Sequence, residues 1–309
     1  MPKHRLLAAL SFTLALAFVS QASLAKADEP WPEELTNWVK VDEKPVFEGA
    51  GGDAWDQKIR ERGWILYDSD KKEYVLWYTG YNESKTKTRF LGRATSKDGL
   101  QWTRDPKNPI FDKGWVEDVC VVKRDKKYYM FAEGEKDNAH QLISDDGISW
   151  TELGKLDVRT ETGAPISSGP YGTPAAWFEN NEWKLLYERM DRGVWLAASK
   201  DRKVWRDLSD DPVIFLGPDD YDRAAIAVNQ VIERDGYHYA FYHANAIPRG
   251  KTWTTCLARS RDLLHWEKCP KNPILDFDAS SAVLVEGPNG KRLYTMHPKV
   301  FAYENPKKK

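Results

Sequence analysis

The chain has 309 residues, of which 41% are hydrophobic, 30% charged and 13% aromatic, and this composition excludes global disorder. Its formal net charge of −1 provides no basic excess for binding nucleic acid or an anionic membrane surface. The 14 tryptophans, 14 tyrosines and 11 phenylalanines favour short aromatic β-strands separated by polar turns, because helical proteins are usually richer in alanine and leucine.

The N-terminal segment has the features of a secretory signal peptide. Lys3 and Arg5 precede an apolar run over residues 6–19, and Ala25 and Ala27 are small residues at the two positions of the cleavage rule. We therefore expect cleavage of residues 1–27 and a mature chain of residues 28–309 that is secreted or periplasmic. A membrane anchor is the alternative, although the apolar run is short for a span. No membrane contact is expected after cleavage.

A repeated tryptophan pattern determines the predicted fold. Four tryptophans are each followed seven residues later by a proline and two apolar residues, and three of them also end a Ser-x-Asp-x-x-x-Trp run. A looser copy of this run ends at Trp150. The copies recur roughly every 50 to 60 residues, which indicates a stacked or radial array. The four tryptophans followed by proline are Trp38, Trp102, Trp205 and Trp266.

Five pairs of predicted strands lie between these runs, and each pair is joined by a tight turn. Valine, isoleucine, tyrosine and tryptophan dominate the strands, whereas glycine, asparagine and aspartate dominate the turns, as in β-hairpins. A third strand follows the pair in four of the units. The predicted pairs are 64–67 with 74–78, 119–123 with 128–132, 174–178 with 183–187, 226–232 with 237–242, and 282–285 with 292–296; the third strands are 90–95, 141–144, 194–198 and 254–258.

Five units of about four strands predict an all-β fold, a five-bladed β-propeller. The fifth unit lacks the Ser-x-Asp run and its final strand, while the N-terminal segment 38–47 has that ending without a beginning. We therefore predict that the N-terminal strand completes the last blade, so that residues 28–309 form a single ring without open edges. A two-sheet sandwich is the alternative, but it requires no such repeat.

One face of the predicted ring carries most of the candidate functional residues. The loops that enter the innermost strands and those that join the second and third strands open on this face, and they are rich in carboxylates interspersed with aromatic residues. The Ser-x-Asp turns resemble the Asp-box of sialidases, lie on the opposite face and are interpreted as structural. The residues predicted to bind substrate are Asp56, Arg62, Trp115, Tyr171, Asp191, Asp222, Arg223, His243 and His297.

Converging carboxylates and aromatic rings suit a carbohydrate, and a protonated and an ionised carboxyl together usually cleave a glycosidic bond. In blade pattern the mature chain resembles the five-bladed propeller glycosidases, which include the arabinanase and xylosidase, invertase and levansucrase, anhydrogalactosidase and mannoside phosphorylase families. This resemblance implies three acids at the starts of the innermost strands of blades one to three. They would serve as base or nucleophile, as pKa modulator or transition-state stabiliser, and as general acid.

The resemblance assigns these roles to individual residues. The stretch 115–119 is similar to the Ala-Pro-Asp-Val turn of the arabinanase and invertase relatives, which makes Asp118 the modulator. A similar offset from the hairpin turn of blade one points to Glu61 as base or nucleophile, with Asp56 as the alternative. In blade three, Thr173 stands where an acid is expected. The proton-donor role therefore falls to Glu188, after the second strand of that blade.

We therefore predict a secreted glycoside hydrolase that acts on plant or algal oligo- or polysaccharides, without an organic cofactor. His243 is a rival proton donor. A non-catalytic carbohydrate-binding propeller is one alternative, and a phosphorylase whose Arg62, Arg189 and Arg223 bind phosphate is another.

No spacing of potential metal ligands in the sequence supports a metal site, although an axial calcium ion occurs in some of the families that the chain resembles. The pairing of the three cysteines stays open, with a disulfide between Cys256 and Cys269 or free buried thiols as the alternatives.

Overall fold

The computed structural model describes residues 29–248, 250, 252–276 and 278–306. The predicted signal segment, residues 1–27, lies outside the described residues. No helix within the described ranges has the length and apolar character that a membrane span requires.

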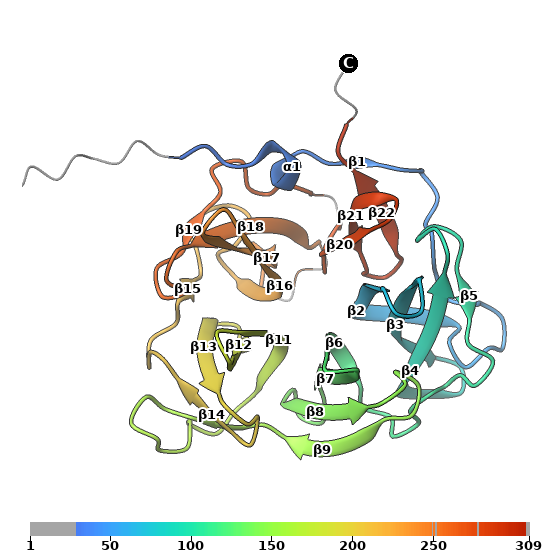
Figure 1. Cartoon of the computed structure of the whole chain (residues 1–309), viewed down its shortest axis with the longest axis horizontal. Helices are drawn as coiled ribbons and strands as arrows, with labels where there is room; N and C mark the ends of the chain where they lie inside the picture. Colours follow the sequence, from blue (N-terminus) through green and yellow to red (C-terminus); the bar gives the residue numbers. More distant parts are fainter. Residues whose placement is uncertain (1–28, 249, 251, 277, 307–309) are drawn as a thin grey trace, which may run out of the picture. The chain divides into compact units, whose positions relative to one another are not determined.

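The unit that begins at Pro32 consists of five β-sheets arranged around a central axis (Figure 1). The innermost strands contact one another in chain order around this axis, and a short helix α1 (Glu33–Thr36) precedes them. The first two blades are antiparallel sheets in which consecutive strands pair, as predicted. Their strands are β2 (Lys58–Asp68), β3 (Glu73–Asn82), β4 (Thr86–Ser96) and β5 (Thr103–Arg104), then β6 (Glu117–Arg124), β7 (Lys127–Glu133), β8 (Ala139–Ser144) and β9 (Thr151–Lys155).

The third blade is larger than the others because two short strands join its sheet. One of them, β10 (Asp157–Arg159), runs parallel to β14 (Val204–Asp207), and the other, β15 (Ile214–Phe215), pairs with β13 (Gly193–Ser199). The strands of blades three and four are β11 (Tyr171–Glu179), β12 (Glu182–Arg189), β13 (Gly193–Ser199) and β14 (Val204–Asp207), then β16 (Ala225–Arg234), β17 (Tyr237–Asn245), β18 (Thr254–Ser260) and β19 (Glu267–Lys268).

The fifth blade contains strands from both ends of the chain. The strands β20 (Val283–Gly287), β21 (Gly290–Thr295) and β22 (Phe301–Glu304) pair in order, and β1 (Val39–Lys40) pairs antiparallel with β22. A further bridge joins Phe47 to Val300. In Figure 1 the blue N-terminal segment lies beside the red C-terminal strands. The predicted closure by the N-terminal strand is therefore confirmed, and it removes the open edge of the ring.

The Ser-x-Asp turns are held by their own side chains. In the first turn, the Asp98 carboxylate accepts hydrogen bonds from the backbone N–H groups of Leu100 and Gln101, both at 2.8 Å. These bonds lower the pKa of Asp98. Trp205 is fully buried and packs edge-on against Phe131 of the neighbouring blade. These contacts agree with a structural role, in which the aspartate fixes a turn and the tryptophan joins two blades.

All three cysteines are buried free thiols. The disulfide alternative for Cys256 and Cys269 is therefore excluded. Cys256 lies on β18, and Cys269 follows β19 of the same blade.

Candidate active site

Four of the innermost strands carry a β-bulge near their first residues. A bulge breaks the alternation of side chains and redirects one of them. The bulge in β6 contains Asp118 and the bulge in β11 contains Thr173, with φ angles of 46° and 45°. The same backbone distortion therefore places these two residues equivalently, as the comparison of blades two and three predicted. The bulges lie between Arg60 and Trp64, Glu117 and Cys120, Gly172 and Ala175, and Val228 and Gln230.

An acid-lined cavity of about 340 Å³ opens at these bulges, and this volume lies at the lower end of the range for small-molecule sites. Of the residues predicted from the sequence, Asp118, Glu188, Asp191, His243 and His297 line it. The cavity also contains residues that the prediction did not select. These are Glu133 and Asp137 of blade two, and Trp253, which precedes β18.

Glu133 is the principal residue that the sequence prediction missed. It ends β7, and its Oε2 accepts hydrogen bonds from the backbone N–H of Thr173 at 2.9 Å and from the Thr173 hydroxyl at 3.2 Å. Burial raises the pKa of Glu133 to about 8, and the nearby charge of Asp118 adds to this rise. Thr173, at the position where an acid was expected, therefore supplies two donors to an acid of the preceding blade.

Glu188 occupies in blade three the place that Glu133 occupies in blade two. Both residues lie near the end of the second strand, opposite the residue that precedes the bulge: Glu133 pairs with Glu117, and Glu188 with Gly172. Burial raises the pKa of Glu188 to about 7. This register equivalence is the sequence signal that could have identified Glu133.

Asp118, which lines the cavity, is hydrogen-bonded to Arg62, which is buried behind the lining. The Asp118 Oδ1 accepts the backbone N–H of Arg62 at 3.2 Å. The Arg62 guanidinium is fully buried and donates to four backbone carbonyls of three other blades. They are those of Val228 at 2.8 Å, Asn229 at 3.2 Å, Asp118 at 2.6 Å and Pro174 at 2.6 Å.

Arg62 was predicted to contact substrate, and this prediction is corrected, because its guanidinium has no exposed surface. It serves as a central cross-link that joins blade one to blades two, three and four. The guanidinium already occupies these backbone carbonyls, and its positive charge opposes the binding of a calcium ion beside them.

His243 lies in the cavity as a neutral side chain. Its Nδ1 is 2.9 Å from the Asn229 amide nitrogen, which donates to it, and its ring packs edge-on against Trp253. Burial lowers the pKa of His243 to about 3, and the charge of Arg62 contributes. A neutral imidazole is a poor general acid, so His243 is disfavoured as the proton donor relative to Glu188. The pKa of His297 is also lowered, chiefly by burial.

Two predicted acids are part of the framework and do not line the cavity. Asp56 is buried and accepts hydrogen bonds from the Tyr78 hydroxyl at 2.9 Å and from Arg104 Nε at 2.8 Å. Asp222 is buried and paired with Lys268. The prediction that these two acids contact substrate is corrected, since both carboxylates are engaged within or beside their own blades.

Three other residues predicted to bind substrate, Trp115, Tyr171 and Arg223, are not among the residues that line the cavity. The Tyr171 hydroxyl donates to a backbone carbonyl at 2.6 Å, and Trp115 packs edge-on against Phe111. Arg223 is exposed and paired with Asp220 at 3.1 Å. The structure therefore does not bring these three residues into the cavity, and their contact with substrate stays a prediction.

Glu61 lies on β2, but its side chain lies outside the described part of the chain. Its predicted role as base or nucleophile therefore stays a prediction.

Gly172 offers a direct test of the position of Glu133. A Cβ atom at residue 172 would lie 2.0 Å from Glu133 Oε2, so Gly172→Ala should displace this carboxylate. We expect kcat/KM on a cleaved substrate to fall about 100-fold, the loss typical of a misplaced catalytic group. The Tm should fall by only a few degrees, because the side chain that must move belongs to the cavity. Full activity of the alanine variant would contradict the placement of Glu133 in the site.

Comparisons with known proteins find similarity to carbohydrate-active proteins. No family model matches the chain. The chain is 23% identical over 218 residues to a 1,2-β-oligomannan phosphorylase of Thermoanaerobacter sp. (strain X514), a match that covers 66% of this chain and 71% of that protein.

Many solved structures share the fold, including the following three. A glycosyl hydrolase from Bacteroides ovatus has a TM-score of 0.72 at 15% identity, covering 90% of this chain and 96% of that one. A second structure comes from work on the GH130 family of mannoside phosphorylases, which contains glycoside hydrolases that target β-1,2-mannosidic linkages in Candida mannan. It has a TM-score of 0.72 at 16% sequence identity, covering 90% of this chain and 97% of that one. The β-1,2-mannobiose phosphorylase of Listeria innocua has a TM-score of 0.63 at 14% sequence identity, covering 87% of this chain and 96% of that one. These likenesses, together with the five sheets of the structure, confirm the five-bladed propeller fold.

Proposed function

We propose that the protein is a glycoside hydrolase that cleaves oligosaccharides in the acid-lined cavity. One observation carries this proposal: Asp118, Glu133 and Glu188, from two adjacent blades, meet in one cavity, and two of them have pKa values raised into the neutral range. Carboxyls that differ in protonation at one pH are the equipment of glycosidic bond cleavage. Trp253 provides an aromatic side chain beside them, which suits stacking on a sugar ring.

The chemistry divides between Glu188 and Asp118. With a pKa of about 7, Glu188 holds a proton near neutral pH and donates it to the glycosidic oxygen as the bond to the anomeric carbon breaks. In this proposal Asp118 acts as the base, a role predicted from the sequence for Glu61, instead of as the pKa modulator. It takes a proton from water as the water attacks that carbon, so that the net result is addition of one water molecule across the bond. Glu133 stays protonated and shapes the electrostatics between them.

The substrate class to test first is the β-1,2-linked mannosides. The phosphorylase relative is named for 1,2-β-oligomannan, and two of the similar structures come from enzymes of β-1,2-mannosides. Plant and algal oligosaccharides, the class predicted from the sequence, remain the comparison panel. The signal-like residues 1–27 support a periplasmic or secreted site of action.

Phosphorolysis is the second candidate, because two of these similar proteins are named as phosphorylases. It requires a site for inorganic phosphate. The residues that line the cavity in the described ranges include five carboxylic acids and two histidines, but no lysine or arginine. Arg62 is bound to backbone carbonyls, Arg223 is paired with Asp220, and Arg189 donates to Ser167 and lies over Trp195. Charge in the cavity thus favours water over phosphate as the attacking species.

The experiment compares products with and without inorganic phosphate. Purified protein is incubated with β-1,2-mannooligosaccharides and with the plant and algal panel, and the sugars are identified by chromatography. We expect free reducing sugar at a rate that phosphate changes less than about twofold, because water is abundant and needs no anion site. Accumulation of a sugar 1-phosphate only when phosphate is present would favour the phosphorylase. Binding without any cleavage would favour a carbohydrate-binding propeller.

A further inference from the structure

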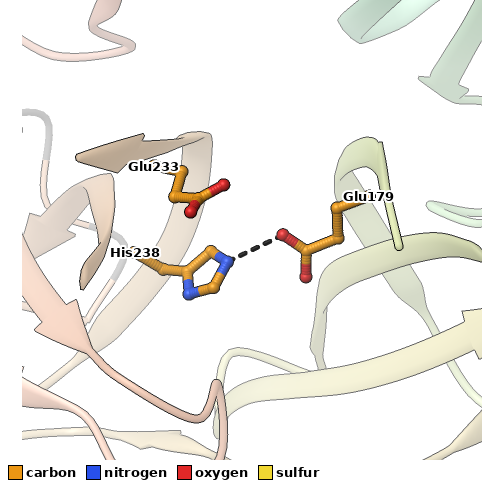
Figure 2. Close-up of side chains that lie close together, drawn as sticks. All are labelled: Glu179, Glu233 and His238. Atoms are coloured by element: carbon orange, nitrogen blue, oxygen red, sulfur yellow. Dashed lines mark hydrogen bonds and ion pairs between the residues drawn. The ribbon is translucent and has the colours of Figure 1, made fainter. Parts of the chain in front are cut away.

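A second group of potential ligands lies outside the acid-lined cavity, where the first hairpins of blades three and four meet. Glu179 is the last residue of β11. Glu233 and His238 are directly opposite each other in the β16–β17 ladder, so their side chains share one face of the sheet. Figure 2 shows this pair facing Glu179 of the neighbouring blade. The three ligand atoms lie within 4.8 Å of one another.

Some polar atoms of Glu179, Glu233 and His238 have no recorded hydrogen-bonding partner in the described ranges. His238 Nε2 is hydrogen-bonded to Glu179 Oε2 at 2.7 Å, while Nδ1 of the same ring is buried without a partner. Within the described ranges the structure records no hydrogen bond or ion pair for the exposed Glu233 carboxylate. The basic residues close in sequence to Glu179 and Glu233 form ion pairs with other acids: Lys184 pairs with Glu182, and Arg234 pairs with Asp235.

We propose that Glu179, Glu233 and His238 bind a divalent transition-metal ion of the Zn²⁺ type. Imidazole together with carboxylates favours such an ion over Mg²⁺ or Ca²⁺, which take oxygen ligands. Tetrahedral coordination with bonds of about 2.0–2.2 Å holds ligand atoms about 3.5 Å apart. The Glu179 and His238 atoms, now 2.7 Å apart, must therefore move apart by about 1 Å as their hydrogen bond is replaced by bonds to the metal. The Glu233 carboxylate must approach them by about 1 Å, and its exposed side chain can supply this movement. Water completes the coordination on the solvent side.

Such an ion would join two blades. Glu179 belongs to blade three, whereas Glu233 and His238 belong to blade four, so the metal replaces one hydrogen bond between blades with three coordination bonds. Because the unfolded chain does not bring these residues together, binding stabilises the folded ring in proportion to the logarithm of the free metal concentration. This role is independent of the chemistry proposed for the acid-lined cavity.

The test is titration of untagged, chelator-treated full-length protein with ZnCl₂ by calorimetry. We expect one Zn²⁺ per chain, and a rise in Tm of about 5 °C at saturating metal. Glu233→Gln should weaken binding at least about tenfold, the effect expected for loss of one ligand, and His238→Gln should abolish it. Glu233→Gln leaves the bond between Glu179 and His238 in place, so it tests the site even where the histidine variant is unstable.

The matched control is His265→Gln. His265 Nδ1 also lies 2.7 Å from a carboxylate, that of Asp262, on an exposed turn, but this pair lacks a third ligand in the described part of the chain. We expect its variant to bind Zn²⁺ as the wild type does. Zn²⁺ binding that survives both Glu233→Gln and His238→Gln, or wild-type protein that binds no Zn²⁺, would overturn the proposal.

Discussion

Glu188→Gln should lower kcat/KM on a cleaved oligosaccharide about 1,000-fold, because the variant loses the proton that the leaving oxygen needs. The substitution keeps the size of the side chain and an oxygen that can accept the Asp191 N–H, a bond of 2.9 Å in the structure. The fold should therefore be retained, with a circular dichroism spectrum like that of the wild type. A glycoside with a highly acidic leaving group needs no protonation, so its cleavage should be affected much less.

The pH profile checks the same assignment. Since the pKa of Glu188 is raised to about 7, the wild-type kcat/KM should fall about tenfold per pH unit above that value as the acid ionises. The fall should disappear in the Gln variant. Glu182→Gln is the control, because Glu182 begins the same strand and pairs with Lys184. A Glu188→Gln enzyme with wild-type activity and an unchanged profile would remove Glu188 from the mechanism.

Arg62→Met should destabilise the protein by about 3–5 kcal/mol, the range observed when one partner of a buried charged contact is removed. The methionine leaves four carbonyls of three blades without their donor, and each buried unpaired group is costly. We expect a fall in Tm of about 10 °C by differential scanning calorimetry. Arg62→Lys should rescue only part of this loss, because an ammonium group has three donors and lacks the planar fork of the guanidinium.

The control for this prediction is Arg223→Met, which removes an exposed arginine and should change stability by less than about 0.5 kcal/mol. If Arg62→Met lowered the Tm no more than Arg223→Met did, the account of Arg62 as a central cross-link would be wrong.

The fold was predictable because its signals are local and repeated. Each blade contributes hairpins with aromatic strands and a tryptophan at the end of a fixed turn, and the unpaired ending at residues 38–47 implied the closure by β1. Such patterns depend on strand periodicity and turn chemistry, which a single sequence contains.

The site was only partly predictable because its side chains come from different blades. Asp118 and Glu188 could be placed on the correct face, but the use of Thr173 as a donor to Glu133 depends on how two blades meet. Arg62 has the charge and the sequence position expected of a substrate-binding residue, and only its burial reveals a structural role. Burial also lowers the pKa of His243 to about 3, and no spacing in the sequence indicates this.

The central claim is that water attacks a glycosidic bond within the acid-lined cavity. The most direct measurement is cleavage of a β-1,2-mannooligosaccharide in H₂¹⁸O, with phosphate present, followed by mass spectrometry of the products. The account predicts one ¹⁸O atom in each newly released reducing sugar from wild-type protein, and almost none from Glu188→Gln in the same time. Unlabelled sugar 1-phosphate as the product, or intact substrate across the full panel of oligosaccharides, would contradict it.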